Sequence, residues 1–339
     1  MGYIKMKSEH FFIVGTERSG SSLLRSILGN HSEINIIPND GNFFGFYDKF
    51  KGKSLNKKEK IFLVNRIKEK GKKLDKWNLD WGKIIAEVKK NEYHQIEDII
   101  KIIWEEHWNN SKGSIKAFKK PYAELYFKLI LSLYPDALFI AIIRDPRAVY
   151  ASRKYYKRRD KTINFKGLLS IYKWNQSERE IRRMKAKLKN RVKIVKYENL
   201  VQSPFEIIKE ICNFLGIQMI KGILNTNKKF EFNSNSSFEP SNIGNKKRVI
   251  YKSSVEKWRK KISNSEIRLV ESQNKILMER ENYNTLKPNL NLMEKINYLL
   301  LLMLYKGIIL ARKIKHYLGD FFRRIVPSRN LNISPPIIE

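Results

Sequence analysis

Along the chain, short runs of apolar residues alternate with longer stretches in which apolar residues recur every three or four positions. The two most continuous runs, Phe11–Val14 and Ala137–Ile143, are typical of strands that are covered on both faces. Three further runs, Ile34–Pro38, Ser114–Phe118 and Val192–Leu200, are shorter strand candidates. Strands that alternate with helices predict an α/β fold of three layers with a central parallel sheet.

Helical spacing of apolar residues follows most of these runs. The first helix is expected from Gly20 to Leu28, with its apolar residues on one face. Later helices are expected directly after Pro121, over residues 168–188, and from Pro204 to Gly216. Proline is tolerated in the first turn of a helix and glycine commonly follows its end, so the last of these has both of its boundaries marked.

A lysine-rich stretch of about 54–110 lies between the second and third predicted strands and is mostly helical by its spacing. Such an insertion is expected to cover the crevice at the edge of the sheet and to bind an acceptor. Its four tryptophans are Trp77, Trp81, Trp104 and Trp108. Tryptophans at helical spacing are more often core residues than platforms for sugar stacking, and we interpret them as core.

The loop between the first strand and the first helix, Gly15 to Gly20, has the chemistry of an anion site. A strand, a glycine loop and a helix N-terminus point several backbone N–H groups at a phosphate. The spacing nearly matches the nucleotide-binding P-loop, but Ser21 stands where that motif requires lysine. Cleavage of ATP or GTP is therefore disfavoured, whereas binding of one 5′-phosphate group is reasonable, with Arg18 supplying positive charge.

Charged residues also follow the other predicted strands. Asp40, Lys119 and Arg144 each lie at or just after the carboxyl end of a strand. Ligands of open parallel sheets collect at that edge, so the three are expected to face one crevice. Instead of facing a ligand, Arg144 could form an ion pair with Asp145 or Glu198.

The charge of the chain narrows the classes of partner. Lys and Arg total 68 against 34 Asp and Glu, a formal net charge of +34. This charge would attract nucleic acid, anionic lipid, acidic polysaccharide or an anionic cofactor. Since no zinc-finger spacing or RNA-binding aromatic motif accompanies it, a specific nucleic-acid partner is not expected. The single cysteine, Cys212, excludes a disulfide within the chain and is interpreted as a buried thiol.

Both ends of the chain bear on localisation. The first strand begins within about ten residues of Met1, which leaves no room for a signal peptide and predicts a cytoplasmic protein. Residues 289–339 form a basic amphipathic tail after a main domain of residues 1–288. Its apolar stretch is interrupted by Lys306 and is shorter than the ~18 residues of a bilayer span. The tail is expected either to lie at an anionic membrane surface, which makes the protein peripheral, or to pack on the core or a second subunit.

Four stretches, in order, resemble the sulfotransferases that use 3′-phosphoadenosine 5′-phosphosulfate (PAPS). GTERSGSSLLRSIL resembles that family's phosphosulfate loop, and AIIRDPRAVYAS resembles its 3′-phosphate segment. VKYENLVQSPFEIIKEICNFLGI and SSVEKWRKKIS resemble two later family segments. The resemblance runs from about Glu9 to Tyr283 and is closer to the tyrosylprotein and carbohydrate sulfotransferases than to the small-phenol group. It implies a P-loop-like fold.

The resemblance implies a role for each candidate residue. Residues of the loop would bind the 5′-phosphosulfate of PAPS: Arg18, Ser19, Gly20, Ser21 and Ser22. Residues of later segments would bind the 3′-phosphate or the rest of the nucleotide: Arg144, Ser152, Tyr197, Arg248 and Lys252. No metal is implied.

Sulfuryl transfer resembles phosphoryl transfer, in which the moving group lies in line between acceptor and leaving oxygens. Arg18 and Lys119 are the candidates that would stabilise the leaving phosphate, and Asp40 is the candidate general base. Asp40 could instead be an ordinary turn residue. His31 is the competing base, but the family resemblance favours a role in capping the end of the first helix. The acceptor would be a hydroxyl of a carbohydrate, a glycolipid or a peptide tyrosine. The alternatives are a P-loop kinase or hydrolase, and a non-catalytic basic protein that binds nucleic acid or membrane.

Overall fold

The computed structural model describes residues 8–37, 42–70, 74, 77–90, 94–155, 165–224 and 254–325. The chain divides into two compact units, which are described separately. The first comprises Met1–Val149 and Lys173–Lys260, and the second Tyr150–Tyr172 and Lys261–Glu339.

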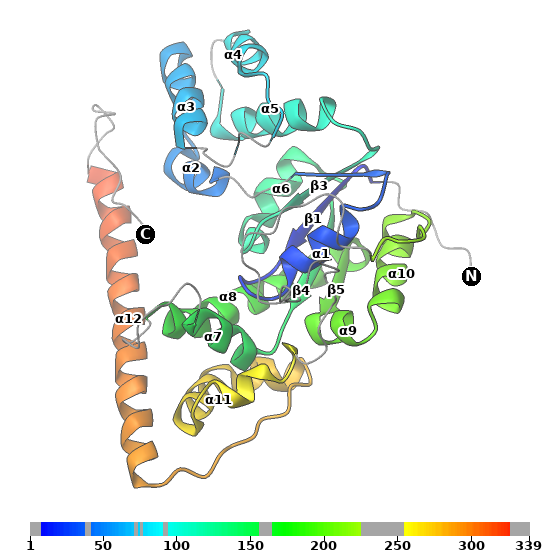
Figure 1. Ribbon diagram of the computed structural model, residues 1–339. Coiled ribbons are helices and arrows are strands. Elements are labelled where there is room, and N and C mark those ends of the chain that lie inside the picture. The colour runs from blue at the N-terminus through cyan, green and yellow to red at the C-terminus, as the bar shows by residue number, and fades with distance from the viewer. Residues whose placement is uncertain are drawn as a thin grey trace, which may run out of the picture. The chain divides into compact units, whose positions relative to one another are not determined.

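A parallel sheet of five strands forms the centre of the first unit, in the order β2-β3-β1-β4-β5 (Figure 1). This confirms the predicted fold class. In the register, Ile13 of β1 lies opposite Lys119 of β3 on one side and Ile140 of β4 on the other. The strands are β1 His10–Val14, β2 Ile34–Ile36, β3 Ile115–Lys119, β4 Leu138–Ile143 and β5 Val192–Lys196.

Helices cover both faces of this sheet. The helices α7 Pro146–Lys154 and α8 Phe165–Leu188 each contribute residues to both units. The other helices of the first unit are α1 Ser21–Leu28, α2 Phe43–Phe50, α3 Lys57–Lys70, α4 Trp81–Lys89, α5 Ile96–Asn109, α6 Phe127–Leu133, α9 Tyr197–Gln202 and α10 Pro204–Leu215.

The alternation of side chains along β1 divides the core into two parts. Phe12 and Val14 pack with the insertion helices and α6, whereas Phe11 and Ile13 pack with α1, α9 and α10. Successive side chains of a strand point to opposite faces, so both faces of β1 are buried. This explains why its sequence is a continuous apolar run rather than an alternating one.

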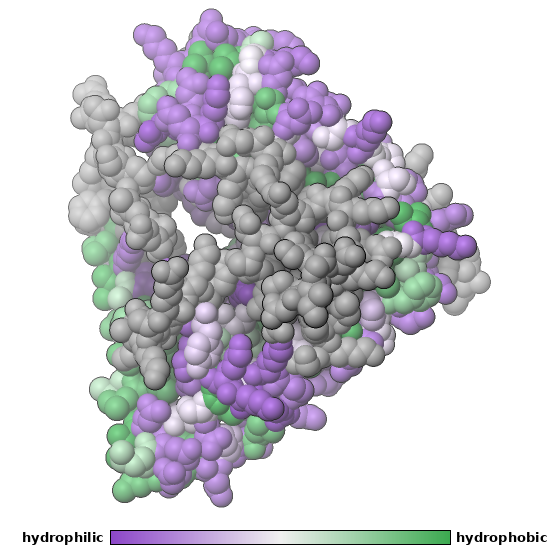
Figure 2. Space-filling model, in the orientation of Figure 1, coloured by the Kyte–Doolittle hydropathy of each residue, from purple (hydrophilic) through white to green (hydrophobic). Residues whose placement is uncertain are grey.

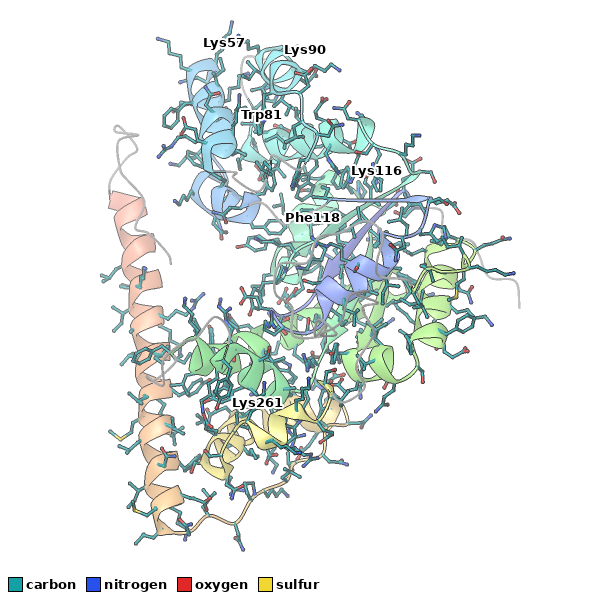
Figure 3. The ribbon with its side chains drawn as sticks, in the orientation of Figure 1. Lys57, Trp81, Lys90, Lys116, Phe118 and Lys261 are labelled. Atoms are coloured by element: carbon teal, nitrogen blue, oxygen red, sulfur yellow. The ribbon has the colours of Figure 1, made fainter. Side chains whose placement is uncertain are left out.

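The insertion between β2 and β3 is helical, as expected, and its tryptophans are core residues. Trp77 and Trp104 are fully buried and Trp108 is 2% exposed, while Trp81 packs against the same cluster from the edge. The Trp104 ring centroid lies 4.7 Å from that of Phe118, which is on β3 in the interior of the first unit (Figure 3). The insertion is therefore fixed to the sheet by aromatic packing.

One predicted boundary was wrong, and another was nearly correct. The fifth strand was expected to reach Leu200, but it ends at Lys196 and α9 follows at once. Tyr197, Leu200 and Val201 are buried together, and their spacing is that of a helix face. The helix expected after Pro121 begins at Ala123, as a 3-10 turn over Ala123–Tyr126 that continues into α6. Tyr122, which precedes it, is left-handed (φ 64°), and its N–H donates to the Gly15 carbonyl at 2.9 Å.

In the second unit, α11 Asn264–Arg280 packs against α12 Leu292–Ile325. Ser263 and Glu266 form a capping box at the start of α11. Glu266 also accepts a hydrogen bond from the hydroxyl of Tyr150 at 2.7 Å and pairs with Lys154, also at 2.7 Å. Burial and the nearby Glu266 raise the pKa of Tyr150, which stays a neutral donor. In the described part of the chain, no helix is both long and apolar enough to cross a bilayer.

The fold predicts that two aromatic residues of the insertion contribute very differently to the free energy of unfolding. Trp104→Ala removes a fully buried ring and is expected to lower the free energy of unfolding by about 3 to 5 kcal/mol. Phe62→Ala, on α3, removes a ring that is 43% exposed and is expected to cost less than about 1 kcal/mol. Urea unfolding followed by circular dichroism measures both values. Equal losses would show that the insertion is not fixed through Trp104.

Candidate functional site

The predicted site lies at the carboxyl ends of three neighbouring strands. Lys119 ends β3, the loop 15–20 follows β1, and Arg144 follows β4. Because β3 and β4 flank β1 on opposite sides, this loop occupies the position in the sheet where ligands of open α/β folds bind.

Two glycines allow the loop to lie against its neighbours. Gly15 has φ 127°, and a Cβ on it would stand 2.3 Å from the carbonyl oxygen of Ile142. Gly20 has φ 102°, and a Cβ there would stand 2.3 Å from Cδ2 of Tyr197. Both positions need a positive φ and space that only glycine leaves.

The loop ends at a helix N-terminus that suits an anion. The Ser19 hydroxyl donates to the carbonyl of Thr16 at 2.7 Å, which closes the loop upon itself. The residue preceding α1 is Gly20, which has no side chain to cap the helix, and the first turn carries no acidic residue. Backbone N–H groups and the helix dipole are thus directed at the loop, and no carboxylate in the first turn of α1 competes for them.

Arg144 is joined to this loop and is 8% exposed. Its Nη1 donates to the Arg18 carbonyl at 3.1 Å and its Nη2 to the Ser254 carbonyl at 3.0 Å. The guanidinium carbon lies 4.0 Å from the ring centroid of Tyr197. Among the described residues, its buried Nε has no hydrogen-bond partner.

The carboxylates beside Arg144 bind other groups, contrary to the ion-pair alternative. Asp145 pairs with Arg147 at 2.6 Å, and the Arg147 guanidinium lies over Trp258. Glu198 accepts the backbone N–H of Asp145 at 3.0 Å, and burial raises the pKa of Glu198. The hydrogen bonds of Arg144 go to neutral carbonyls, so its positive charge is not neutralised by a directly bonded carboxylate.

The comparisons with known proteins agree with this geometry. The model of the sulfotransferase family matches residues 10–221, which is more than half of the 339-residue chain. The chain belongs to the sulfotransferase family. That match covers the loop, Lys119, Arg144 and Tyr197.

Among its relatives are putative protein-tyrosine sulfotransferases of Caenorhabditis briggsae and Caenorhabditis elegans, 39% and 37% identical over 111 residues. Each alignment covers 31% of this chain, and it spans 38% and 41% of the two relatives. The chain is therefore aligned with well under half of these relatives.

Solved sulfotransferase domains share the fold. The domain from the Synechococcus PCC 7002 olefin synthase is 21% identical, with a TM-score of 0.57 over 82% of this chain and 96% of that one. The domain from the curacin biosynthetic pathway is 16% identical, with a TM-score of 0.55 over 81% and 97%.

Tyr197 packs against the loop. It is fully buried at the start of α9, and its hydroxyl shares a hydrogen bond of 2.7 Å with the hydroxyl of Ser254. Its ring lies between Gly20 and the guanidinium of Arg144. The geometry gives Tyr197 a packing role, and contact with the nucleotide stays a prediction.

The remaining predicted residues are distributed as follows. Arg18 lies in the loop with a left-handed backbone (φ 68°), and Ser19, Gly20, Ser21 and Ser22 follow it into α1. Ser152 lies on the part of α7 that belongs to the second unit. Asp40, Arg248 and Lys252 lie outside the described residues, so their roles stay predictions.

His31, the competing base, has a structural role. It is 1% exposed; its Nδ1 accepts the backbone N–H of Glu33 at 3.2 Å, and its Nε2 donates to the Gln218 carbonyl at 2.8 Å. Both ring nitrogens are occupied, so the residue holds the end of α1 rather than a substrate.

Sequence reasoning missed Glu124, a fully buried carboxyl group beneath the loop. One oxygen accepts the Gly15 N–H at 2.8 Å and the other accepts the hydroxyl of Ser177 on α8. Burial raises the pKa of Glu124 to about 7 although these hydrogen bonds lower it. The signal in the sequence was a single acidic residue among the apolar positions of AELYFKLIL. A carboxyl group that is buried at such a position needs a hydrogen-bond partner.

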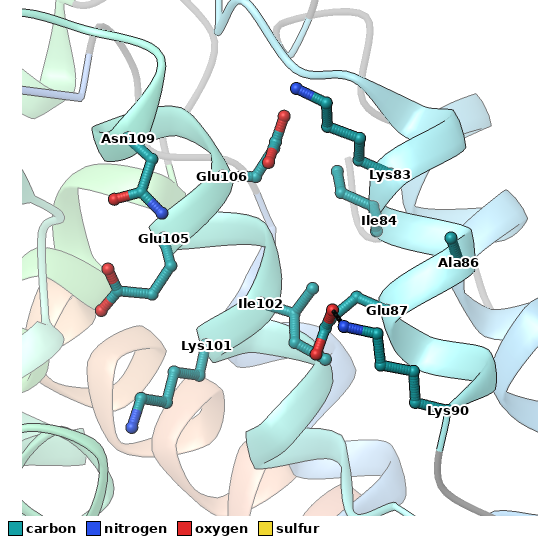
Figure 4. Close-up of a pocket in the computed structure, with 10 residues that line it drawn as sticks. All are labelled: Lys83, Ile84, Ala86, Glu87, Lys90, Lys101, Ile102, Glu105, Glu106 and Asn109. Atoms are coloured by element: carbon teal, nitrogen blue, oxygen red, sulfur yellow. Dashed lines mark ion pairs between the residues drawn. The ribbon is translucent and has the colours of Figure 1, made fainter.

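A groove between α4 and α5 lies apart from this site. Figure 4 shows Ile102 and Glu106 of α5 on the side of Lys83 and Ile84 of α4, whereas Lys101 and Glu105 point away from α4. Burial would raise the pKa of Glu105, but the nearby His10 ring and the hydrogen bond from Lys116 lower it to about 2. The residues that line this groove include none of those predicted for catalysis. Among the described residues, no cluster of three or more His, Cys, Asp or Glu could hold a metal ion.

Glu124 predicts a specific dependence of stability on pH. Its pKa is higher in the folded chain (about 7) than the ordinary 4.5, so its contribution to stability is complete below about pH 4.5 and is lost as pH rises through 7. At about 1.4 kcal/mol per pKa unit, the loss is on the order of 3 kcal/mol. Glu124→Gln should remove this slope. Denaturation of both proteins from pH 5 to 8 measures it, and parallel curves would contradict the assignment.

Proposed function

We propose that this protein transfers the sulfuryl group of PAPS to a hydroxyl acceptor. The observation that carries the proposal is the lysine-free anion loop, with Arg18, Lys119 and Arg144 at the ends of three adjacent strands. Membership of the sulfotransferase family supports the reaction class.

The residues of the first unit fit the anionic groups of PAPS. The uncapped start of α1 and the loop N–H groups suit the 5′-phosphosulfate. Arg144 is a buried cation with its Nε unpaired among the described residues, which suits the 3′-phosphate. One N–H of each Nη is bonded to a carbonyl, so the guanidinium is held in place before the ligand arrives.

The chemistry requires cations where charge develops. As the sulfuryl group moves in line to the acceptor oxygen, negative charge accumulates on the leaving phosphate of 3′,5′-adenosine bisphosphate. Arg18 and Lys119 are the cations that would stabilise that charge. Asp40 is the proposed base that would take the proton of the acceptor hydroxyl. The names of the two Caenorhabditis relatives support a peptide tyrosine as the first acceptor to test, before sugars and glycolipids.

Binding tests the nucleotide half of the proposal. 3′,5′-Adenosine bisphosphate is expected to raise the melting temperature of the full chain, and ATP with Mg²⁺ to raise it much less. Arg144→Ala should remove most of the shift, because it deletes the buried cation. Arg183→Ala is the matched control, since its side chain is 74% exposed on α8 and the variant loses the same charge. If Arg144→Ala kept the full shift, the nucleotide assignment would be wrong.

Transfer tests the catalytic half. With labelled PAPS and tyrosine peptides, sugars and glycolipids as acceptors, Lys119→Met should lower kcat about 10²- to 10³-fold, since it deletes one stabilising group. Lys116→Met is the control on the same strand, because Lys116 binds Glu105 at 2.9 Å, away from the loop (Figure 3). Equal activity of the two variants would exclude a catalytic role for Lys119. ATP hydrolysis without sulfuryl transfer would refute the function itself.

A further inference from the structure

Helix α12 of the second unit exposes a continuous apolar stripe. Since residues advance about 100° each around a helix, the side chains of this stripe lie within a sector of roughly 100°. Figure 2 shows hydrophobic residues in green along the edge of the view that α12 occupies in Figure 1. The stripe comprises nine residues that are 44 to 74% exposed: Leu292, Ile296, Leu299, Leu300, Met303, Leu310, Ile314, Tyr317 and Leu318.

The opposite side of α12 is the one that packs within the unit. Glu294, on that side, accepts a hydrogen bond from Asn264 at 2.9 Å, and its carbonyl accepts one from Ser265 at 2.8 Å. The apolar residues of that side are partly buried: Tyr298, Leu301, Leu302, Leu304, Tyr305, Ile308 and Ile309. Helix α12 therefore carries two apolar faces, and the contact with α11 leaves the stripe uncovered.

A row of lysines borders the stripe on one side. Lys295, Lys306 and Lys313 share one helical position, next to Leu299 and Tyr317, and all three are exposed. The exposed Lys315 lies on the other side. Between Leu292 and Leu318 the only acidic residue is Glu294, which is on the packed side.

We infer that this stripe binds the surface of a bilayer that contains anionic lipid, with α12 lying parallel to the membrane. Apolar side chains would enter the boundary between headgroups and acyl chains, while the lysine row would meet anionic headgroups. Lys306 in the middle of the helix is incompatible with a spanning orientation but suits this one. A second copy is a poor occupant, because pairing two such faces would bring together lysine rows of a chain with net charge +34.

Vesicle flotation with the full chain tests the inference. The protein is expected to float with phosphatidylcholine vesicles that contain phosphatidylglycerol, and much less with phosphatidylcholine alone. Lys306→Gln combined with Lys313→Gln should weaken partitioning by roughly fivefold per lysine at physiological salt. This measurement does not depend on sulfuryl transfer.

A matched pair of variants separates the stripe from the overall charge. Met303→Glu places a carboxylate in the stripe and should lower the partition coefficient about tenfold or more. Ile276→Glu, at an exposed position of α11 (72%), changes charge and hydropathy in the same way outside the stripe and should have little effect. Unchanged melting temperatures show that both variants fold, as expected for exposed sites.

Three outcomes would overturn the inference. Equal effects of Met303→Glu and Ile276→Glu would mean that diffuse positive charge binds the vesicles. An absence of binding to anionic vesicles would exclude the surface outright. A lipid-free dimer in sedimentation velocity that Met303→Glu dissociates would assign the stripe to a second copy of the chain.

Discussion

The close contact between the Gly15–Gly20 loop and its neighbours is the constraint on which the site depends. Gly15 lies against the carbonyl of Ile142 and Gly20 against the ring of Tyr197, at distances that exclude a Cβ at either position. Its backbone is further fixed by Glu124 at one end and by Arg144 at Arg18. Such a loop has little freedom left to lose when an anion binds, which favours affinity.

Two buried ionisable side chains, Glu124 and Arg144, hold the loop in this position. Glu124 lies under the start of the loop, where burial favours its neutral form, and it accepts hydrogen bonds from Gly15 and Ser177. Arg144 is bonded to carbonyl oxygens and lies over an aromatic ring, so no directly bonded carboxylate neutralises it. Arg144 thus presents a positive charge beside the loop.

The two units differ in how completely their apolar residues are buried. In the first unit, both faces of β1 are buried, and the tryptophans of the insertion pack with the residues of one of these faces. In the second, α12 has more apolar surface than α11 covers. An exposed apolar surface on a helix that is bordered by lysines is typical of a site that contacts another molecule or a membrane.

The sequence alone determined the parallel α/β fold, the loop after the first strand and the positions of Lys119 and Arg144, because buried strands and glycine loops leave local patterns. It also identified the helical insertion and α10, whose boundaries are marked by Pro204 and Gly216. Only the tertiary structure decided where β5 ends, which groups the His31 ring binds, and that Arg144 binds carbonyls rather than Asp145. It also disclosed Glu124, since its partners Gly15 and Ser177 are 109 and 53 residues away in the chain. Such contacts join segments that are distant in the chain, so no local sequence pattern predicts them.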